Sequence, residues 1–90
     1  MSVKPARSSS KGTDETSEGM RALFGANFRR GRQKAKLTQV AVEELTGIRQ
    51  HYISEVAHGL HNLTLGTMMA LAQAVGSDVR ALLKRPSRRR

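Results

Sequence analysis

Cysteine is absent from this sequence, and so is any long hydrophobic run. Without cysteine the chain has neither disulfide bonds nor thiolate-bound zinc. No apolar stretch approaches the ~18 residues that a membrane-spanning helix needs. The first residues also lack the apolar segment of a secretory signal. We therefore expect a soluble protein of the cytoplasm that has no membrane partner.

Acidic residues are few. Seven Asp and Glu stand against sixteen Lys and Arg, which gives a formal net charge of +9. Residues 19–84 hold nine basic and four acidic side chains, and residues 85–90 add four arginines, so the excess is not confined to one end. A basic surplus of this kind makes polyanions, above all nucleic acids, the first partners to consider. With 90 residues there is one domain with one modest core, and no room for an elaborate enzyme.

The distribution of apolar residues divides the chain into three parts. Residues 1–17 are almost all polar, so their ordering would cost conformational entropy with little burial in return, and we predict a disordered, flexible arm. Residues 18–84 carry the regularly spaced apolar positions of a folded domain, and residues 85–90 form a basic C-terminal tail. Because no strand-like alternation competes with the helical spacing, the predicted fold class is all-α, a compact domain of five helices.

Capping residues and apolar spacing place the five helices. The predicted helices cover about residues 19–35, 38–46, 49–57, 64–75 and 78–84, and Gly47 permits a sharp turn between the second and the third. The candidate caps are Thr16 or Ser17, Thr38, Thr64, and Ser77 or Asp78. The side chains predicted to face inward are Met20, Leu23, Phe24, Phe28, Ala35, Val42, Thr46, Ile48, Tyr52, Ile53, Val56, Leu65, Met68, Leu71, Ala72 and Val75. The fourth helix is apolar on nearly all sides, so we expect it to be central.

An ordered set of residues within this pattern carries a family resemblance. The set consists of Thr38 and Gln39, Val42, Gly47 and Ile48, the run from Tyr52 to Val56, Gly59, Asn62, Thr64 and Leu65, Thr67, and the run from Leu71 to Gly76. Over about Phe24 to Leu83 the chain resembles the lambda-repressor-like, Cro/Xre-type helix-turn-helix family. The resemblance implies a DNA-binding transcriptional regulator, a repressor rather than an activator, that binds double-stranded DNA as a homodimer without a cofactor.

In such a fold the third helix lies in the major groove of DNA. By resemblance, the residues that face the bases are Arg49, Gln50, His51, Ser54 and Glu55. Their stereochemistry suits guanine for Arg49, adenine for Gln50 and cytosine for Glu55. Gln39, beside Thr38, matches the family position that contacts the phosphate backbone. Further candidates for phosphate contact are Arg29, Arg30, Arg32, Lys34, Lys36, His58 and the Arg tail.

The sequence departs from the family pattern at two main positions, and more mildly at Leu63, where a proline is common after the loop Asn. Glu43 stands where the family usually has a small residue, commonly Ala, and Ala57 stands where it usually has a Glu. In the family that Glu pairs with an arginine at the position of Arg32, which is therefore left without its customary partner. Our hypothesis is that Arg32 either bridges to Glu43 or turns toward a DNA phosphate, because an unpaired buried guanidinium is costly.

Val79, Leu82 and Leu83 are the candidate dimer contacts, since the family pairs through its C-terminal region. An antitoxin that binds a toxin protein and represses its own gene, or a controller of restriction and modification, would use the same DNA-binding chemistry. His58 and His61 lack a third ligand for zinc, and Ser54 lacks the buried acid of a hydrolytic triad, so we predict neither a metal site nor an enzyme.

Overall fold

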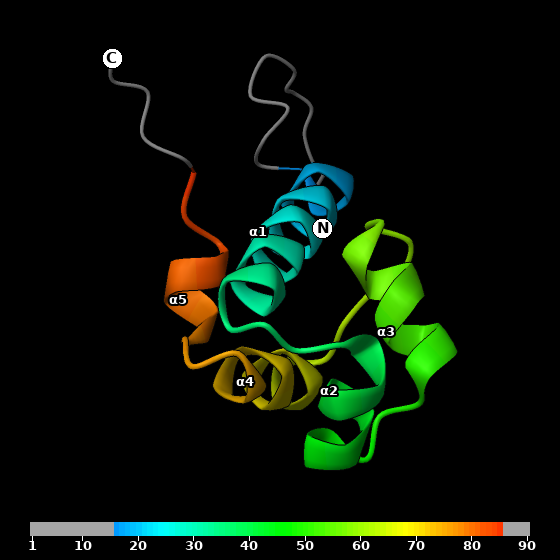
Figure 1. Ribbon diagram of the computed structural model, residues 1–90. Helices are drawn as coiled ribbons and strands as arrows, with labels where there is room; N and C mark the ends of the chain where they lie inside the picture. The colour runs from blue at the N-terminus through cyan, green and yellow to red at the C-terminus, as the bar shows by residue number, and fades with distance from the viewer. Residues whose placement is uncertain (1–15, 86–90) are drawn as a thin grey trace.

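The computed structural model describes residues 16–85, and this region is all-helical. Its helices are α1 (Ser17–Lys34), α2 (Gln39–Thr46), α3 (Gln50–Ala57), α4 (Leu65–Ala74) and α5 (Val79–Leu82), which confirms the predicted fold class (Figure 1). The predicted arm lies outside the described residues except for its last two, and the predicted tail except for Arg85. None of the helices in residues 16–85 is long and apolar enough to cross a membrane.

Side-chain caps start four of the helices. Thr16, Thr38 and Thr64 each accept a hydrogen bond through Oγ1 from a backbone N–H three residues later, at 2.8–3.1 Å. Asp78 does the same for α5 through Oδ1, at 2.8 Å from the N–H of Ala81. Each bond satisfies one of the backbone donors that a helix start leaves unpaired. The caps expected from the sequence are therefore confirmed, with Thr16 and Asp78 selected from the two ambiguous pairs.

All five helices contribute buried side chains to one core. Its fully buried large side chains are Phe24, Phe28, Val42, Ile53, Val56 and Leu71, all of which helical spacing predicts. Two expectations were wrong, because Ala35 is exposed beyond the end of α1 and Leu65 is 63% exposed at the start of α4. The other predicted side chains that are not buried in the core are half-buried: Met20, Leu23, Thr46, Ile48, Tyr52 and Met68. Of the adjacent methionines, Met68 packs against the core and Met69 is exposed.

One proposed dimer contact belongs to this core instead. Leu82 is 4% exposed and packs among the buried residues, so its side chain is unavailable to a second subunit while the domain is folded. The neighbouring Val79 and Leu83 are only partly buried. The side chain of Leu82 thus attaches the four-residue α5 to the core. The sequence prediction named Leu82 as a dimer contact because the family pairs through its C-terminal region.

A glycine sets the distance between α1 and α3. Gly25 is buried, and a Cβ added there would lie 2.4 Å from the carbonyl oxygen of Val56 and 3.0 Å from that of Ala57. Both neighbours are backbone atoms of α3, which cannot rotate away as a side chain can. Only a residue without a side chain therefore allows α1 to pack this closely on the end of α3.

We expect Gly25→Ala to destabilise the domain by about 1–3 kcal/mol, because the added methyl group must force α1 and α3 apart. Gly66→Ala is the matched control, since the nearest atom to its Cβ is 4.0 Å away and alanine favours a helix. The control should leave stability unchanged or raise it by about 0.5–1 kcal/mol. Urea unfolding followed by circular dichroism measures both. Equal effects of the two substitutions would contradict the close contact.

Candidate nucleic-acid interface

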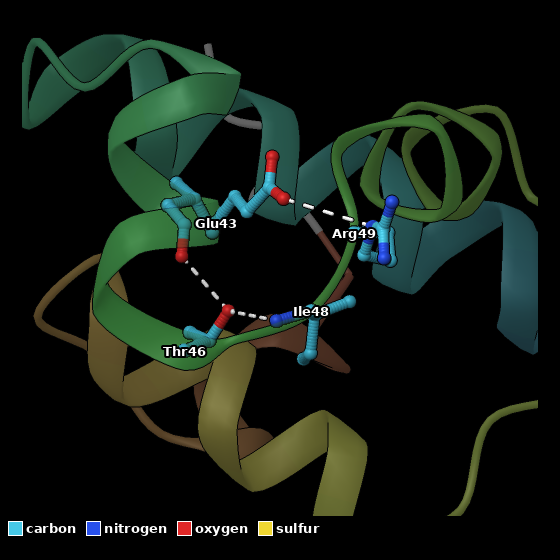
Figure 2. A network of polar contacts seen from close by, with 5 residues as sticks. Glu43, Thr46, Ile48 and Arg49 are labelled. Carbon is cyan, nitrogen blue, oxygen red and sulfur yellow. Dashed lines mark hydrogen bonds and ion pairs between the residues drawn. The ribbon is translucent and has the colours of Figure 1, made fainter.

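The turn between α2 and α3 is held by a small network of hydrogen bonds. Gly47 ends α2 in the left-handed conformation at φ 79°, and its N–H donates to the carbonyl of Glu43 at 2.7 Å. Thr46 donates through Oγ1 to the carbonyl of Val42 at 2.8 Å and accepts from the N–H of Ile48 at 3.1 Å (Figure 2). Because Ile48 also packs against the core, the direction in which α3 leaves the turn is fixed.

A groove of about 610 Å³, open to solvent, runs between α2 and α3. It is lined by Gln39, Glu43, Arg49, Gln50, His51, Ser54 and Glu55. All five residues expected to face bases are thus brought together with Gln39, which was expected to contact the backbone. Thr38 does not line the groove, but it caps the helix turn that presents Gln39. The side chains of Arg49, Gln50 and His51 are exposed and carry hydrogen-bond donors or acceptors.

Glu43 is the groove residue that the sequence prediction did not assign to the site. Its Oε2 lies 3.8 Å from Nε of Arg49 (Figure 2). The hypothesis of a bridge between Glu43 and Arg32 was therefore wrong. Arg32 instead donates through Nη1 to the carbonyl of Leu37 at 2.9 Å, and its Nε is buried without a protein partner. The signal that could have pointed to Glu43 is its departure from the small residue usual in the family.

Glu55 has a partner outside the groove. Its Oε1 lies 2.5 Å from Nε2 of His61, in the loop between α3 and α4. The ring of His61 stacks on Tyr52, with centroids 4.3 Å apart and the planes inclined by 29°. One oxygen of the carboxylate is therefore engaged by the protein, and the contact ties the loop to α3. Sequence reasoning missed this because residues 52, 55 and 61 meet only once the loop has folded back.

Two of the arginines expected to contact phosphate brace the fold. Arg29 donates through Nη1 to the carbonyl of Ala57 at 3.1 Å, and thus joins α1 to the end of α3. Arg32 makes its bond to Leu37 in the turn that leads to α2. Both side chains are half-buried. The bond from Arg29 satisfies one of the carbonyls that the C-terminal end of α3 leaves without a backbone donor.

Arg30 and Lys34 lie on another side of α1. They line a second groove, of about 450 Å³, together with residues of the turn between α4 and α5. Arg30 donates through Nη2 to Oδ1 of Asn27 at 2.6 Å, and Asn27 donates in turn to the carbonyls of Leu82 and Lys84. In Figure 1, α5 and α3 lie on opposite sides of α1. These two cations are therefore separated from the groove between α2 and α3.

Two further candidates for phosphate contact are Lys36, shortly before α2 in the sequence, and His58, directly after α3. Lys36 is exposed in the turn that precedes α2, where its backbone has a φ of 60°. His58 is exposed at the C-terminal end of α3, and its Nδ1 lies 2.8 Å from the carbonyl oxygen of Ser54. Within residues 16–85, no three His, Cys, Asp or Glu side chains gather as they would around a metal ion.

The charge of the groove differs from that of the whole chain. Two carboxylates, of Glu43 and Glu55, line it beside a single guanidinium, that of Arg49. Within residues 16–85, the basic surplus therefore lies outside the groove. A short helix that carries both hydrogen-bond donors and acceptors is better suited to the edges of bases than to a run of phosphates.

Comparison with known proteins agrees with this geometry. A family model described as helix-turn-helix matches residues 28–82, from the middle of α1 to the end of α5. An uncharacterized HTH-type transcriptional regulator of Sinorhizobium fredii, y4dJ, is 46% identical over 57 residues, which cover 63% of this chain and 74% of that protein. Control protein C.SmaI of Serratia marcescens is 32% identical over 66 residues, which cover 73% of this chain and 79% of that protein.

The matched residues include the whole unit from the cap of α2 to the end of α3, with its fixed turn and its groove. The chain therefore belongs to the helix-turn-helix family of DNA-binding regulators, of the Cro/C1 type.

Proposed function

We propose that this protein is a transcriptional repressor that recognises a specific DNA sequence by placing α3 in the major groove. The observation that carries the proposal is the groove between α2 and α3, which gathers Gln39 and the five expected base-facing residues on one open surface. A helix fits the major groove, and each base pair presents a distinct set of donors and acceptors there. The protein would act on the nucleoid in the cytoplasm and would have no catalytic role.

Arg49, Gln50, His51 and Ser54 are the residues that we assign to base contact. They lie at the N-terminal end and on the outer side of α3, at an angle fixed by the turn. Arg49 suits guanine and Gln50 suits adenine, because each can form a pair of hydrogen bonds with that base. His61 holds one carboxylate oxygen of Glu55, which leaves the other oxygen to accept from a cytosine amino group.

Gln39, with Thr38, is the proposed anchor on the DNA backbone. It is the first residue of α2, where the unpaired N–H groups and the helix dipole attract a phosphate. Such a contact sets the register of the helix on the duplex and carries no sequence preference. Lys36, which is exposed and three residues earlier in the chain, is the proposed charge contact next to this anchor.

We further propose that the protein binds as a homodimer through Val79, Leu83 and their surroundings on α5. Both side chains are partly exposed beside the buried Leu82, so a partner could cover them without opening the core. Two-fold symmetry would then require an operator of two half-sites, about 10 bp apart from centre to centre.

Control of a restriction–modification system is a second candidate function. It is favoured by the likeness to control protein C.SmaI. The DNA-binding chemistry would be the same, and the two functions differ in which promoters carry the site. A reporter gene fused to the selected operator, read with and without the protein, separates repression from activation.

Selection of bound duplexes from a random pool tests the proposed readout. We expect the natural protein to enrich one roughly palindromic sequence at moderate salt. Gln50→Ala with His51→Ala should lose that preference and keep weak binding, because phosphate contacts do not depend on α3 side chains. Gln73→Ala is a matched control on the exposed side of α4, and it should enrich the same sequence. Unchanged enrichment by the double variant would contradict base contact by α3.

The salt dependence of binding tests which cations meet phosphates. We expect Lys36→Gln to reduce the slope of log K against log salt by about 1, as the loss of one phosphate contact does. The double variant Arg30→Gln with Lys34→Gln removes two charges on the α5 side of α1 and should leave the slope nearly unchanged. A slope reduced by about 2 in the double variant would show that the duplex also reaches that side.

A further inference from the structure

A carboxylate, that of Glu43, lines the groove at the position where the family usually has a small side chain. Glu43 is on the last turn of α2, and Arg49 directly precedes α3, at the opposite wall of the groove. The two charges meet at 3.8 Å, between Oε2 of Glu43 and Nε of Arg49 (Figure 2). The side chain of Arg49 is 77% exposed and that of Glu43 is 35% exposed, so the arginine reaches outward and the glutamate supports it from within.

The backbone on both sides of this pair is fixed. The carbonyl of Glu43 accepts the N–H of Gly47, and Thr46 links the carbonyl of Val42 to the N–H of Ile48. The positions of the two Cα atoms are thus set by the turn, and only side-chain rotations remain free. An ion pair between such exposed groups adds little to stability. Its effect is to restrict the directions in which the arginine side chain points.

The position of the carboxylate determines which part of the Arg49 guanidinium can contact DNA. A guanidinium can form paired hydrogen bonds through its side, with Nε and one Nη, or through its end, with both Nη atoms. Glu43 lies nearest to Nε, at 3.8 Å, which is the distance of a charge attraction and not of a hydrogen bond. This attraction favours the orientation in which the Nε side faces the carboxylate and the end with both Nη atoms faces away from it. Two parallel N–H donors at the end match O6 and N7 of guanine in the major groove.

We propose that Glu43 is a specificity-determining residue that positions Arg49 for a guanine and keeps it off the phosphate backbone. This inference rests on the proposed function, since it requires that α3 lie in the major groove. Without the carboxylate, the flexible side chain of Arg49 would contact base edges in some complexes and nearby phosphates in others. With it, the carboxylate repels a negatively charged phosphate that approaches Arg49 much more strongly than it repels the uncharged edge of a guanine. Glu43 thus lowers affinity for DNA in general and raises the preference for one base pair.

The test uses Glu43→Gln, which keeps the length of the side chain and removes its charge. Glu44→Gln is the matched control, because Glu44 is the adjacent residue of the same helix, is exposed and does not line the groove. Arg49→Ala and the double variant Arg49→Ala with Glu43→Gln complete a cycle. Binding of each protein is measured by fluorescence anisotropy on the selected operator, on operators changed at each position in turn, and on unrelated duplex DNA. Circular dichroism melting confirms that every variant is folded.

We expect Arg49→Ala to lose discrimination at one G·C pair, by about fivefold or more, as the loss of a paired contact does. Glu43→Gln should lose part of the discrimination at that same pair and should bind unrelated DNA more tightly than Glu44→Gln does. In the Arg49→Ala background, Glu43→Gln should cause no further loss of discrimination.

Two results would overturn the inference. If Glu43→Gln and Glu44→Gln strengthen binding equally on every duplex, the carboxylate only repels phosphates and positions nothing. If Arg49→Ala relaxes no base pair while the Gln50 and His51 variant does, α3 still recognises bases but Arg49 is no part of that recognition. A natural protein that enriches no sequence at all would instead contradict the proposed function itself.

Discussion

The turn between α2 and α3 determines where every outward side chain of α3 points. Gly47 allows the chain to reverse at a positive φ, Thr46 closes the turn by bonding on both sides, and Ile48 holds it against the core. None of these residues needs to touch DNA. Yet a rotation of α3 by a fraction of a helical turn would replace its polar side with the buried Ile53 and Val56. Recognition by side chains therefore depends first on a backbone constraint.

That constraint is useful only because α1 fixes the other end of α3. Gly25 lets the two helices touch at the backbone of Val56 and Ala57, and Arg29 bonds to the carbonyl of Ala57 from the same side. Ala57, which stands where the family usually has a Glu, is itself buried. Arg32, without that partner, bonds to the carbonyl of Leu37 and stiffens the approach to α2. In place of the ion pair usual in the family, Arg32 thus forms a hydrogen bond with a backbone carbonyl.

Features that depend on neighbouring residues in the chain could be predicted from the sequence, and features that depend on side chains meeting across the fold could not. The caps at Thr38 and Thr64 and the burial of Phe24, Phe28 and Val42 follow from local spacing. The grouping of the base-facing residues followed from the family resemblance. The pairs Glu43–Arg49 and Glu55–His61 follow from neither, because each depends on how two elements are oriented. The burial of Leu82 likewise depends on how α5 closes over α1 and α4.

The separation of charge between the groove and the rest of the surface bears on how such a protein discriminates. Attraction to phosphates acts on all DNA alike, so a groove lined by many cations would raise affinity for correct and incorrect sequences together. Here the groove has one guanidinium between two carboxylates, and each carboxylate has a partner of its own. Cations elsewhere on the domain supply general attraction at longer range. A nearly neutral groove then makes the fit of donors and acceptors to the base edges the main difference between one site and another.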